Sequence, residues 1–240
     1  MQLDIFIKGE EIRLPISTSS TIQGIIYNAL KKDNNYSSYL HDHGNNLNGR
    51  KYKFFTFSDI RGNYRIENKE IVFLECANFS VRSTDAYLIQ LLFSHFTEHP
   101  EIEIGSSKAK IEKLRLRDEQ IFSDEIRIQT LSPITVYITE SDGHTLYYSP
   151  ADKEFYNAII TNARRKWITR FGSDSDFELE INPVENCSYR RRITRFKETI
   201  ITAWHGEFIL KGSPIVLNFL YNIGLGVKNS QGFGMFEVKK

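Results

Sequence analysis

In the first half of the chain, stretches with the apolar spacing of a strand alternate with stretches with the apolar spacing of a helix. Strand-like runs, alternating or dense in Ile, Val and Phe, occupy residues 2–7, 52–58, 70–77 and 101–104. Between them, residues 22–30 and 84–96 place apolar side chains three and four positions apart, which is the spacing of one helix face. The pattern therefore predicts the order β-α-β-β-α-β.

The same order recurs from about Glu125 onward. Strand-like and helical stretches alternate there as strand 126–138 (broken by Ser132-Pro133), helix 150–171, strands 177–181 and 199–210, helix 214–223 and strand 234–238. Two units with this order indicate an α+β chain of two tandem ferredoxin-like βαββαβ domains packed side by side. The expected domains are residues 1–122 and 123–240.

Composition narrows the class of protein without indicating a partner. The 240 residues are 40% hydrophobic and 25% charged, as in ordinary globular proteins. The net charge of +1 does not favour nucleic acid, so any such argument must rest on local clusters. Cys76 and Cys187 have no paired spacing, which fits a reducing cytosol and argues against a thiolate metal site. With no apolar run of membrane length, we expect a soluble cytoplasmic protein that does not contact a membrane.

A glycine-rich stretch near the end suggests a phosphate-binding loop. Gly224, Gly226, Gly232 and Gly234 surround the polar run 228–231, Lys-Asn-Ser-Gln. Successive backbone N–H groups in such a loop can hold phosphate oxygens. The helix precedes the loop and a strand follows it, the reverse of a dinucleotide fingerprint, and no P-loop Gly-Lys-Ser/Thr step is present. Spacing alone leaves open a second interpretation, a tight helix-to-strand connection.

Two basic clusters favour an RNA partner. Residues 189–197 carry five positive charges, no acid and interleaved aromatic residues, and residues 164–167 read Arg-Arg-Lys-Trp. Guanidinium groups pair with phosphates and stack on bases, a mixture suited to single-stranded or hairpin RNA. The alternative for the first cluster is a hairpin whose charged tip only maintains solubility.

A candidate acid–base set lies between residues 27 and 53. Tyr27 falls within the first helix, His41 near the end of a short second helix expected over 36–44, and Lys53 at the start of a strand. A histidine transfers protons near neutral pH, and a lysine stabilises negative charge on a phosphorane. Each residue also has a structural alternative. His41 could cap the C-terminus of a helix, Tyr27 could be a half-buried packing residue, and Lys53 could be a solvated charge on an edge strand. Ligation of a metal by His41 and His43 lacks a third ligand at diagnostic spacing.

Several segments together resemble a known family. They are 224–235 (GLGVKNSQGFGM), 202–205 (TAWH), 131–134 (LSPI), 153–156 (KEFY), 23–29 (QGIIYNA), 39–41 (YLH) and 53–58 (KFFTFS). They are similar to segments of the CRISPR-associated endoribonucleases that cut precursor CRISPR RNA within each repeat. The resemblance spans essentially the whole chain.

This resemblance implies a fold, a chemistry and a set of residues. The fold is again tandem ferredoxin-like. The chemistry is metal-independent and needs no cofactor: the 2′-hydroxyl of the RNA attacks the adjacent phosphate and leaves 2′,3′-cyclic phosphate and 5′-hydroxyl ends. By local motif, the catalytic residues are Tyr27, His41 and Lys53, with His43 and Lys51 as rivals for the last two.

The RNA-binding residues expected from the loop, the clusters and the resemblance are Lys51, Arg164, Arg165, Arg190, Arg191, Arg192, Arg195, Gly224, Gly226, Lys228, Asn229, Ser230, Gln231 and Gly232. The expected partner is CRISPR repeat RNA. Subunits of a type I or type III effector complex and a second copy of the chain are further partners that the resemblance allows. Two other functions stay open: a non-catalytic repeat-RNA-binding subunit, and a metal-dependent nuclease using His41 and His43.

Overall fold

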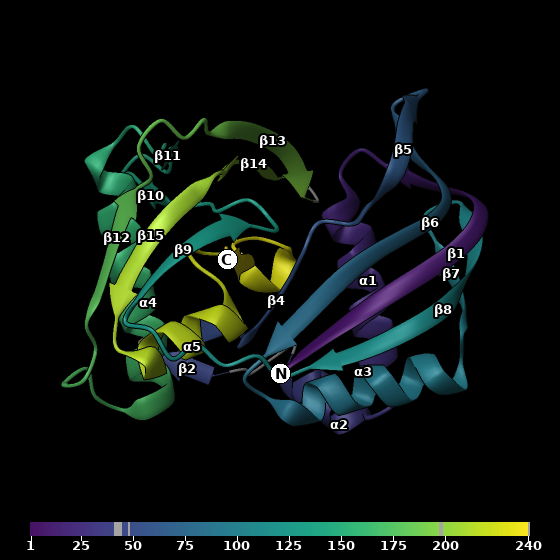
Figure 1. The fold of residues 1–240 in the computed structure, drawn as a ribbon, viewed down its shortest axis with the longest axis horizontal. Coiled ribbons are helices and arrows are strands. Elements are labelled where there is room, and N and C mark those ends of the chain that lie inside the picture. The colour runs from purple at the N-terminus through teal and green to yellow at the C-terminus, as the bar shows by residue number, and fades with distance from the viewer. Residues whose placement is uncertain (41–44, 48, 197–198, 240) are drawn as a thin grey trace.

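The chain forms two sheet-and-helix halves that lie side by side (Figure 1). The computed structural model describes residues 1–40, 45–47, 49–196 and 199–239. The amino group of Met1 lies at the junction of the halves, 2.7 Å from Oδ1 of Asn222 in the second half. Within the described residues, no helix combines the length and the apolar character needed to cross a bilayer.

The first half is an antiparallel sheet with the strand order β4-β6-β1-β8-β7, and β5 pairs with β6. Its elements are β1 (Gln2–Pro15), α1 (Thr18–Leu30), α2 (Asn34–Ser38), β4 (Phe55–Phe57), β5 (Arg61–Glu67), β6 (Glu70–Ser83), α3 (Ala86–Glu98), β7 (Glu101–Ile104) and β8 (Ser107–Arg117). Alternate β1 residues such as Leu3, Ile5 and Ile7 are buried together with Ile22 and Ile26 of α1. The period-two and helical patterns thus meet in one core.

The second half repeats this topology, with the strand order β12-β15-β9-β16. Its elements are β9 (Glu125–Thr130), α4 (Lys153–Phe171), β12 (Leu179–Pro183), β15 (Glu207–Gly212), α5 (Pro214–Ile223) and β16 (Phe236–Val238). Strand β1 lies between β6 and β8, and β9 lies between β15 and β16. In each half the first strand of the βαββαβ unit thus lies between its third and its last strand, as in ferredoxin-like folds. The predicted tandem fold is confirmed, whereas the boundary between residues 122 and 123 stays a prediction.

Short strands complete the fold outside the two sheets. They form three hairpins: β2 (Asn45–Leu47) with β3 (Arg50–Tyr52), β10 (Tyr137–Thr139) with β11 (Thr145–Tyr147), and β13 (Arg190–Phe196) with β14 (Thr199–His205). The basic residues 190–195 therefore lie on a hairpin strand. A 3₁₀ turn, η2 (Asn229–Gln231), occupies the centre of the glycine-rich stretch.

Three strand predictions were wrong in detail. Residues 199–210 are not one strand, because the chain breaks at Gly206 and continues from the β13–β14 hairpin into the β15 sheet strand. A Cβ at Gly206 would lie 2.3 Å from the Tyr189 ring. The last strand of the first unit is β8, which pairs with β1, while residues 101–104 form the edge strand β7. Of the predicted 134–138 segment, only its end belongs to a strand.

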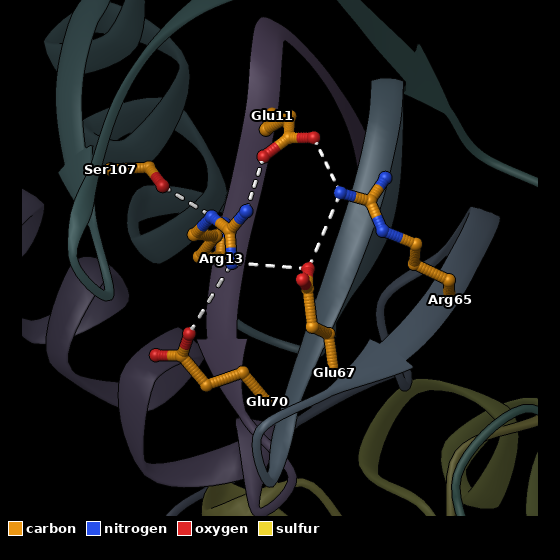
Figure 2. A network of polar contacts seen from close by, with 6 residues as sticks. All are labelled: Glu11, Arg13, Arg65, Glu67, Glu70 and Ser107. Carbon is orange, nitrogen blue, oxygen red and sulfur yellow. Dashed lines mark hydrogen bonds and ion pairs between the residues drawn. The ribbon is translucent and has the colours of Figure 1, made fainter.

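The long β5–β6 hairpin was not predicted, because β5 is exposed along almost its whole length and shows no buried face. Polar contacts fix it to β1 (Figure 2). The Glu11 carboxylate accepts hydrogen bonds from Arg13 and Arg65, each at 2.6 Å, and Glu67 accepts from both at 3.4 and 3.3 Å. Exposed pairs of this kind contribute little individually, about 0–1 kcal/mol.

Buried polar contacts join the two halves. Arg82 of β6 is fully buried, stacks 3.4 Å from the centroid of the Tyr221 ring, and donates to the carbonyls of Tyr221 and Phe236. Asp59, just after β4, accepts a 2.5 Å hydrogen bond from Arg192 of β13. These contacts set the orientation of the halves and hence the shape of the space between them.

Candidate functional site

A cleft of about 970 Å³ lies between the two halves of the molecule. One wall comes from the first half: Gln23 of α1 and residues 50–54 of β3 and the link to β4. The opposite wall comes from α4, β10 and the glycine-rich stretch. The cleft thus brings together segments more than 80 positions apart in the chain.

Lys53 lines this wall and contacts Tyr27, which lies next to it and is not among the described residues that line the cleft. The Lys53 ammonium group donates a 2.8 Å hydrogen bond to the Tyr27 phenol oxygen and lies 5.1 Å from the centroid of the same ring. Burial raises the pKa of Tyr27 to about 12. At neutral pH the phenol is therefore protonated, and it can donate a hydrogen bond to a substrate while it accepts one from Lys53.

The predicted histidines cannot be placed beside this pair. His41 and His43 fall within residues 41–44, outside the described residues. Of the three catalytic positions expected from the sequence, the structure therefore brings two together. The rival lysine, Lys51, is exposed and also lines the cleft.

Cationic side chains from both halves line the cleft. Lys51 and Arg50 belong to the first half, and Arg165 and Lys228 to the second. The Lys228 ammonium group lies 5.6 Å from the centroid of the Tyr137 ring, and burial lowers its pKa. Lys228 also has a left-handed backbone, with φ of 61°, which is uncommon for a residue with a side chain.

The other predicted basic residues lie elsewhere. Arg164 pairs with Asp174 at 2.9 Å, and its guanidinium group lies 5.1 Å from the Phe177 ring centroid. Arg190, Arg191 and Arg195 are exposed on β13. Arg192 is half-buried and paired with Asp59. The described residues that line the cleft include none from β13.

Six backbone N–H groups of the glycine-rich stretch are not available for the expected phosphate nest. Gly224, Gly226 and Gly232 are buried. The backbone N–H groups of residues 224, 225, 227, 231, 232 and 234 already donate to carbonyl groups of the protein. For these six groups the prediction was wrong.

The glycines instead allow close packing. Gly232 has a φ of 86°, and a Cβ there would lie 2.5 Å from the Phe57 ring, while one at Gly234 would lie 1.9 Å from the Leu225 carbonyl oxygen. This close packing fits a tight helix-to-strand connection, and phosphate binding by the loop stays a prediction. Ser230, Gln231 and Lys228 remain at the cleft surface, whereas the side chain of Asn229 is buried and bonded within the protein.

Lys166, which the sequence places in the basic run 164–167, is instead buried against this stretch, and its contacts there were not predicted. Its ammonium group donates to the carbonyls of Gly224 and Gly226 at 3.0 and 2.7 Å and to Oδ1 of Asn229 at 2.6 Å. The available signal was its helical position. Lys166 follows Ala163 by three residues and Ile159 by seven, on the buried face of α4.

Comparison with known protein families decides the assignment. Residues 116–238 match the family "CRISPR associated protein Cas6, C-terminal". This chain belongs to the Cas6 family. The resemblance stated from the sequence is thereby confirmed.

Two curated relatives match over nearly the whole chain. "CRISPR-associated endoribonuclease Cas6" of Pyrococcus furiosus is 27% identical over 239 residues, which cover 97% of this chain and 86% of the relative. "CRISPR-associated endoribonuclease Cas6 1" of Methanocaldococcus jannaschii is 26% identical over 233 residues, covering 92% and 86%. The similarity therefore includes the first half, outside the region of the family match.

Solved structures support the same fold. A structure described as "An RAMP protein binding different RNA substrates" superposes with a TM-score of 0.84 at 20% identity and covers 100% of both chains. Another, described as "Characterization of a Cas6-related gene from Pyrococcus furiosus", gives 0.83 at 18% identity, covering 100% of this chain and 98% of that one. Cas6 proteins thus share both halves of this architecture.

Proposed function

We propose that this chain is an endoribonuclease that cleaves precursor CRISPR RNA within its repeats. The observation that carries the proposal is the Lys53–Tyr27 pair, held at 2.8 Å beside a cleft lined by cations from both halves. The names of two curated relatives, both CRISPR-associated endoribonucleases, support the reaction class and the substrate.

The cleft suits a strand of RNA by its charge and its aromatic lining. Arg50, Lys51, Arg165 and Lys228 present positive charge from two sides, and such charge attracts the phosphate backbone. Tyr52, Tyr137 and Tyr148 also line the cleft and offer rings on which unpaired bases can stack. A strand bound between the walls passes the Lys53 ammonium group.

Cleavage follows from the positions of these two side chains. The 2′-hydroxyl of the RNA attacks the adjacent phosphorus, the bond to the 5′-oxygen breaks, and a 2′,3′-cyclic phosphate and a 5′-hydroxyl result. Lys53 stabilises the charge on the phosphorane. Tyr27, protonated because burial raises its pKa to about 12, orients the attacking hydroxyl through a hydrogen bond.

The proton transfer is assigned to His41 from the resemblance alone. An imidazole near neutral pH can take the proton of the 2′-hydroxyl or protonate the leaving oxygen. His43 is the alternative, and only functional data on both positions will choose between them. The chemistry requires no metal, because the nucleophile belongs to the substrate and the side chains move the proton.

The test is product analysis with the chain's own repeat RNA. Purified protein and 5′-labelled repeat RNA are incubated in excess EDTA, and the product ends are examined. We expect one cut per repeat, with 2′,3′-cyclic phosphate and 5′-hydroxyl ends. Cleavage only after divalent ions are added would overturn the metal-independent reaction. Tight binding without any product would instead indicate a non-catalytic repeat-binding subunit.

A further inference from the structure

The ammonium group of Lys166 is buried without a carboxylate among its hydrogen-bond partners. Lysine is almost never fully buried unless paired, because its charge loses the solvation of water. Its three acceptors here are two peptide carbonyls and one side-chain amide, all from residues 224–229. A costly buried donor with three convergent acceptors fixes the conformation of the segment that supplies them.

The segment held by Lys166 is the connection 224–234, which also touches the first half. Asn229 extends the contacts of Lys166, because its Nδ2 donates to the carbonyls of Leu225 and Phe233, each at 2.9 Å. The two ends of the connection are thus tied to its centre. Lys166 and Asn229 together define its shape from the α4 side.

Two side chains of the first half bind the same connection from the other side. Nε2 of Gln23 donates to the Ser230 carbonyl at 2.7 Å, and Oγ1 of Thr56 donates to the Phe233 carbonyl at 3.2 Å. Gln23 lies one helical turn before Tyr27 on α1. Thr56 lies three residues after Lys53, at the start of β4.

We propose that Lys166 is a positioning residue for RNA cleavage: by holding the connection 224–234, it sets the position of α1 and β4, and so of Tyr27 and Lys53, relative to the cations of the opposite wall. This inference rests on the proposed endoribonuclease activity. The Lys166 side chain also lines the cleft, but this role rests on its hydrogen bonds to the connection. Its effect passes through the loop backbone to Gln23 and Thr56.

The effect on function is expected to fall on the chemical step. Displacements of about 1 Å from changes remote from the reacting atoms can cost about 10²-fold in rate. Lys166→Met keeps an unbranched side chain one heavy atom shorter and removes its charge and its donors. We expect the single-turnover rate, with saturating protein in excess over repeat RNA, to fall by about 10- to 100-fold, while the Kd for the RNA changes by less than about fivefold. A general loss of folded protein would change both quantities together.

The matched control is Lys153→Met, a lysine on the same helix that is exposed and does not line the cleft. It should leave rate and affinity at the wild-type values. A double-mutant cycle with Gln23→Ala tests the route. Since both changes act through the Ser230 segment, their combined effect on log rate should be smaller than the sum. Full additivity, or a rate for folded Lys166→Met within twofold of the wild type, would overturn the proposal.

Hydrogen exchange provides a readout that does not depend on activity. In Lys166→Met, amides of the connection that are bonded in the wild type, such as those of Leu225 and Gly232, should exchange faster, and in Lys153→Met they should not. Unchanged protection overturns the positioning role even if the wild type cleaves. Absence of cleavage by the wild type refutes the proposed function separately. Should Lys166→Met fail to fold, Gln23→Ala and Thr56→Val probe the same route, and unchanged rates in both would overturn it.

Discussion

Lys53 donates a hydrogen bond to Tyr27 across 26 positions of sequence, from the link before β4 to the last turn of helix α1. The pairing orients the ammonium group along the rim of the cleft and keeps the phenol oxygen next to a positive charge. Both groups are half-buried, so they can reach a bound strand without being surrounded by bulk water. The geometry suits charge stabilisation and orientation of a hydroxyl at one phosphate.

Removing either member of this pair should abolish efficient cleavage without abolishing binding. Lys53→Met loses the charge that stabilises the phosphorane, and we expect the single-turnover rate to fall about 10²–10³-fold. Tyr27→Phe keeps the ring and loses the hydroxyl, with an expected loss of about 10²-fold. Lys8→Met, at an exposed lysine paired with Glu112, is the control. A wild-type rate in Lys53→Met would remove that residue from the mechanism.

Substitution of the two histidines should separate the proton-transfer residue from its neighbour. A general acid or base supplies about 10²–10⁴-fold in rate. We expect His41→Ala to lose this factor while RNA affinity stays nearly intact, and His43→Ala to remain close to the wild type. Single-turnover cleavage of repeat RNA in EDTA measures both. The reverse ranking would transfer the role to His43.

Arg164 and Arg165 are adjacent in the chain but should differ in RNA binding. Arg165 lines the cleft, while Arg164 is held by Asp174. Arg165→Ala should weaken binding and lower the slope of log K against log salt by about 0.7, the value for one phosphate contact to a single strand. Arg164→Ala should change the slope much less. Filter binding over a salt series compares them, and equal slopes would contradict the cleft as the path of the RNA.

Arg192 should act on stability, in contrast to its exposed neighbour Arg191. Arg192 pairs with Asp59 at 2.5 Å, and each side chain is about one-fifth exposed. Breaking a fully buried pair costs about 3–5 kcal/mol, and for this partly solvated pair we expect about 2–3 kcal/mol. Arg191→Ala, on the same strand, should leave the free energy of unfolding nearly unchanged. Urea denaturation of the two variants measures the difference.

The contacts of Asp59 with Arg192 and His205 should also make the free energy of unfolding depend on pH in the acid range. Burial alone would raise the pKa of Asp59, but the hydrogen bond from His205 and the charge of Arg192 outweigh it and hold the pKa below its ordinary value. The folded chain thus binds the proton more weakly than the unfolded chain. The stabilisation is therefore present above about pH 4 and is lost as the pH falls through the folded pKa. Asp59→Asn should remove this part of the acid dependence, and an unaltered acid profile would contradict the assignment.

Lys166 should make stability rise with pH in the same sense, but above neutrality. Burial lowers its pKa to about 7, whereas an unfolded lysine has a pKa of about 10.4. Between these values the unfolded chain binds more protons than the folded chain. The free energy of unfolding should therefore rise with pH from about 7 to 10, by at most about 1.4 kcal/mol per pH unit.

Thermal unfolding at pH 7, 8 and 9 measures this rise. Lys166→Met lacks the amino group that binds a proton on unfolding, so its melting temperature should rise less than that of the wild type over the same interval. Lys153→Met, with its exposed lysine replaced, should follow the wild type. Parallel profiles for the wild type and Lys166→Met would show that Lys166 does not titrate in this range.

The order of the main elements could be predicted from the sequence because it depends on local chemistry. Helix α5 has the predicted bounds, Pro214–Ile223. Ser213 accepts a hydrogen bond from the Val216 N–H, Pro214 occupies the first turn, and the apolar residues repeat at helical spacing. The fold class could be predicted from the repeated βαββαβ order, and the family from the resemblance of short motifs.

Partnerships across the chain could not be predicted in this way. The choice of β8 over β7 as the neighbour of β1, the pairing of Arg192 with Asp59 and the burial of Lys166 under Gly224 and Gly226 all join residues far apart in sequence. Periodicity tells which face of an element is apolar, but not which element will cover it. The sequence by itself therefore determined the elements, their order and the candidate chemical groups. Only the tertiary structure decided which cations face the cleft, since that depends on how the two halves pack.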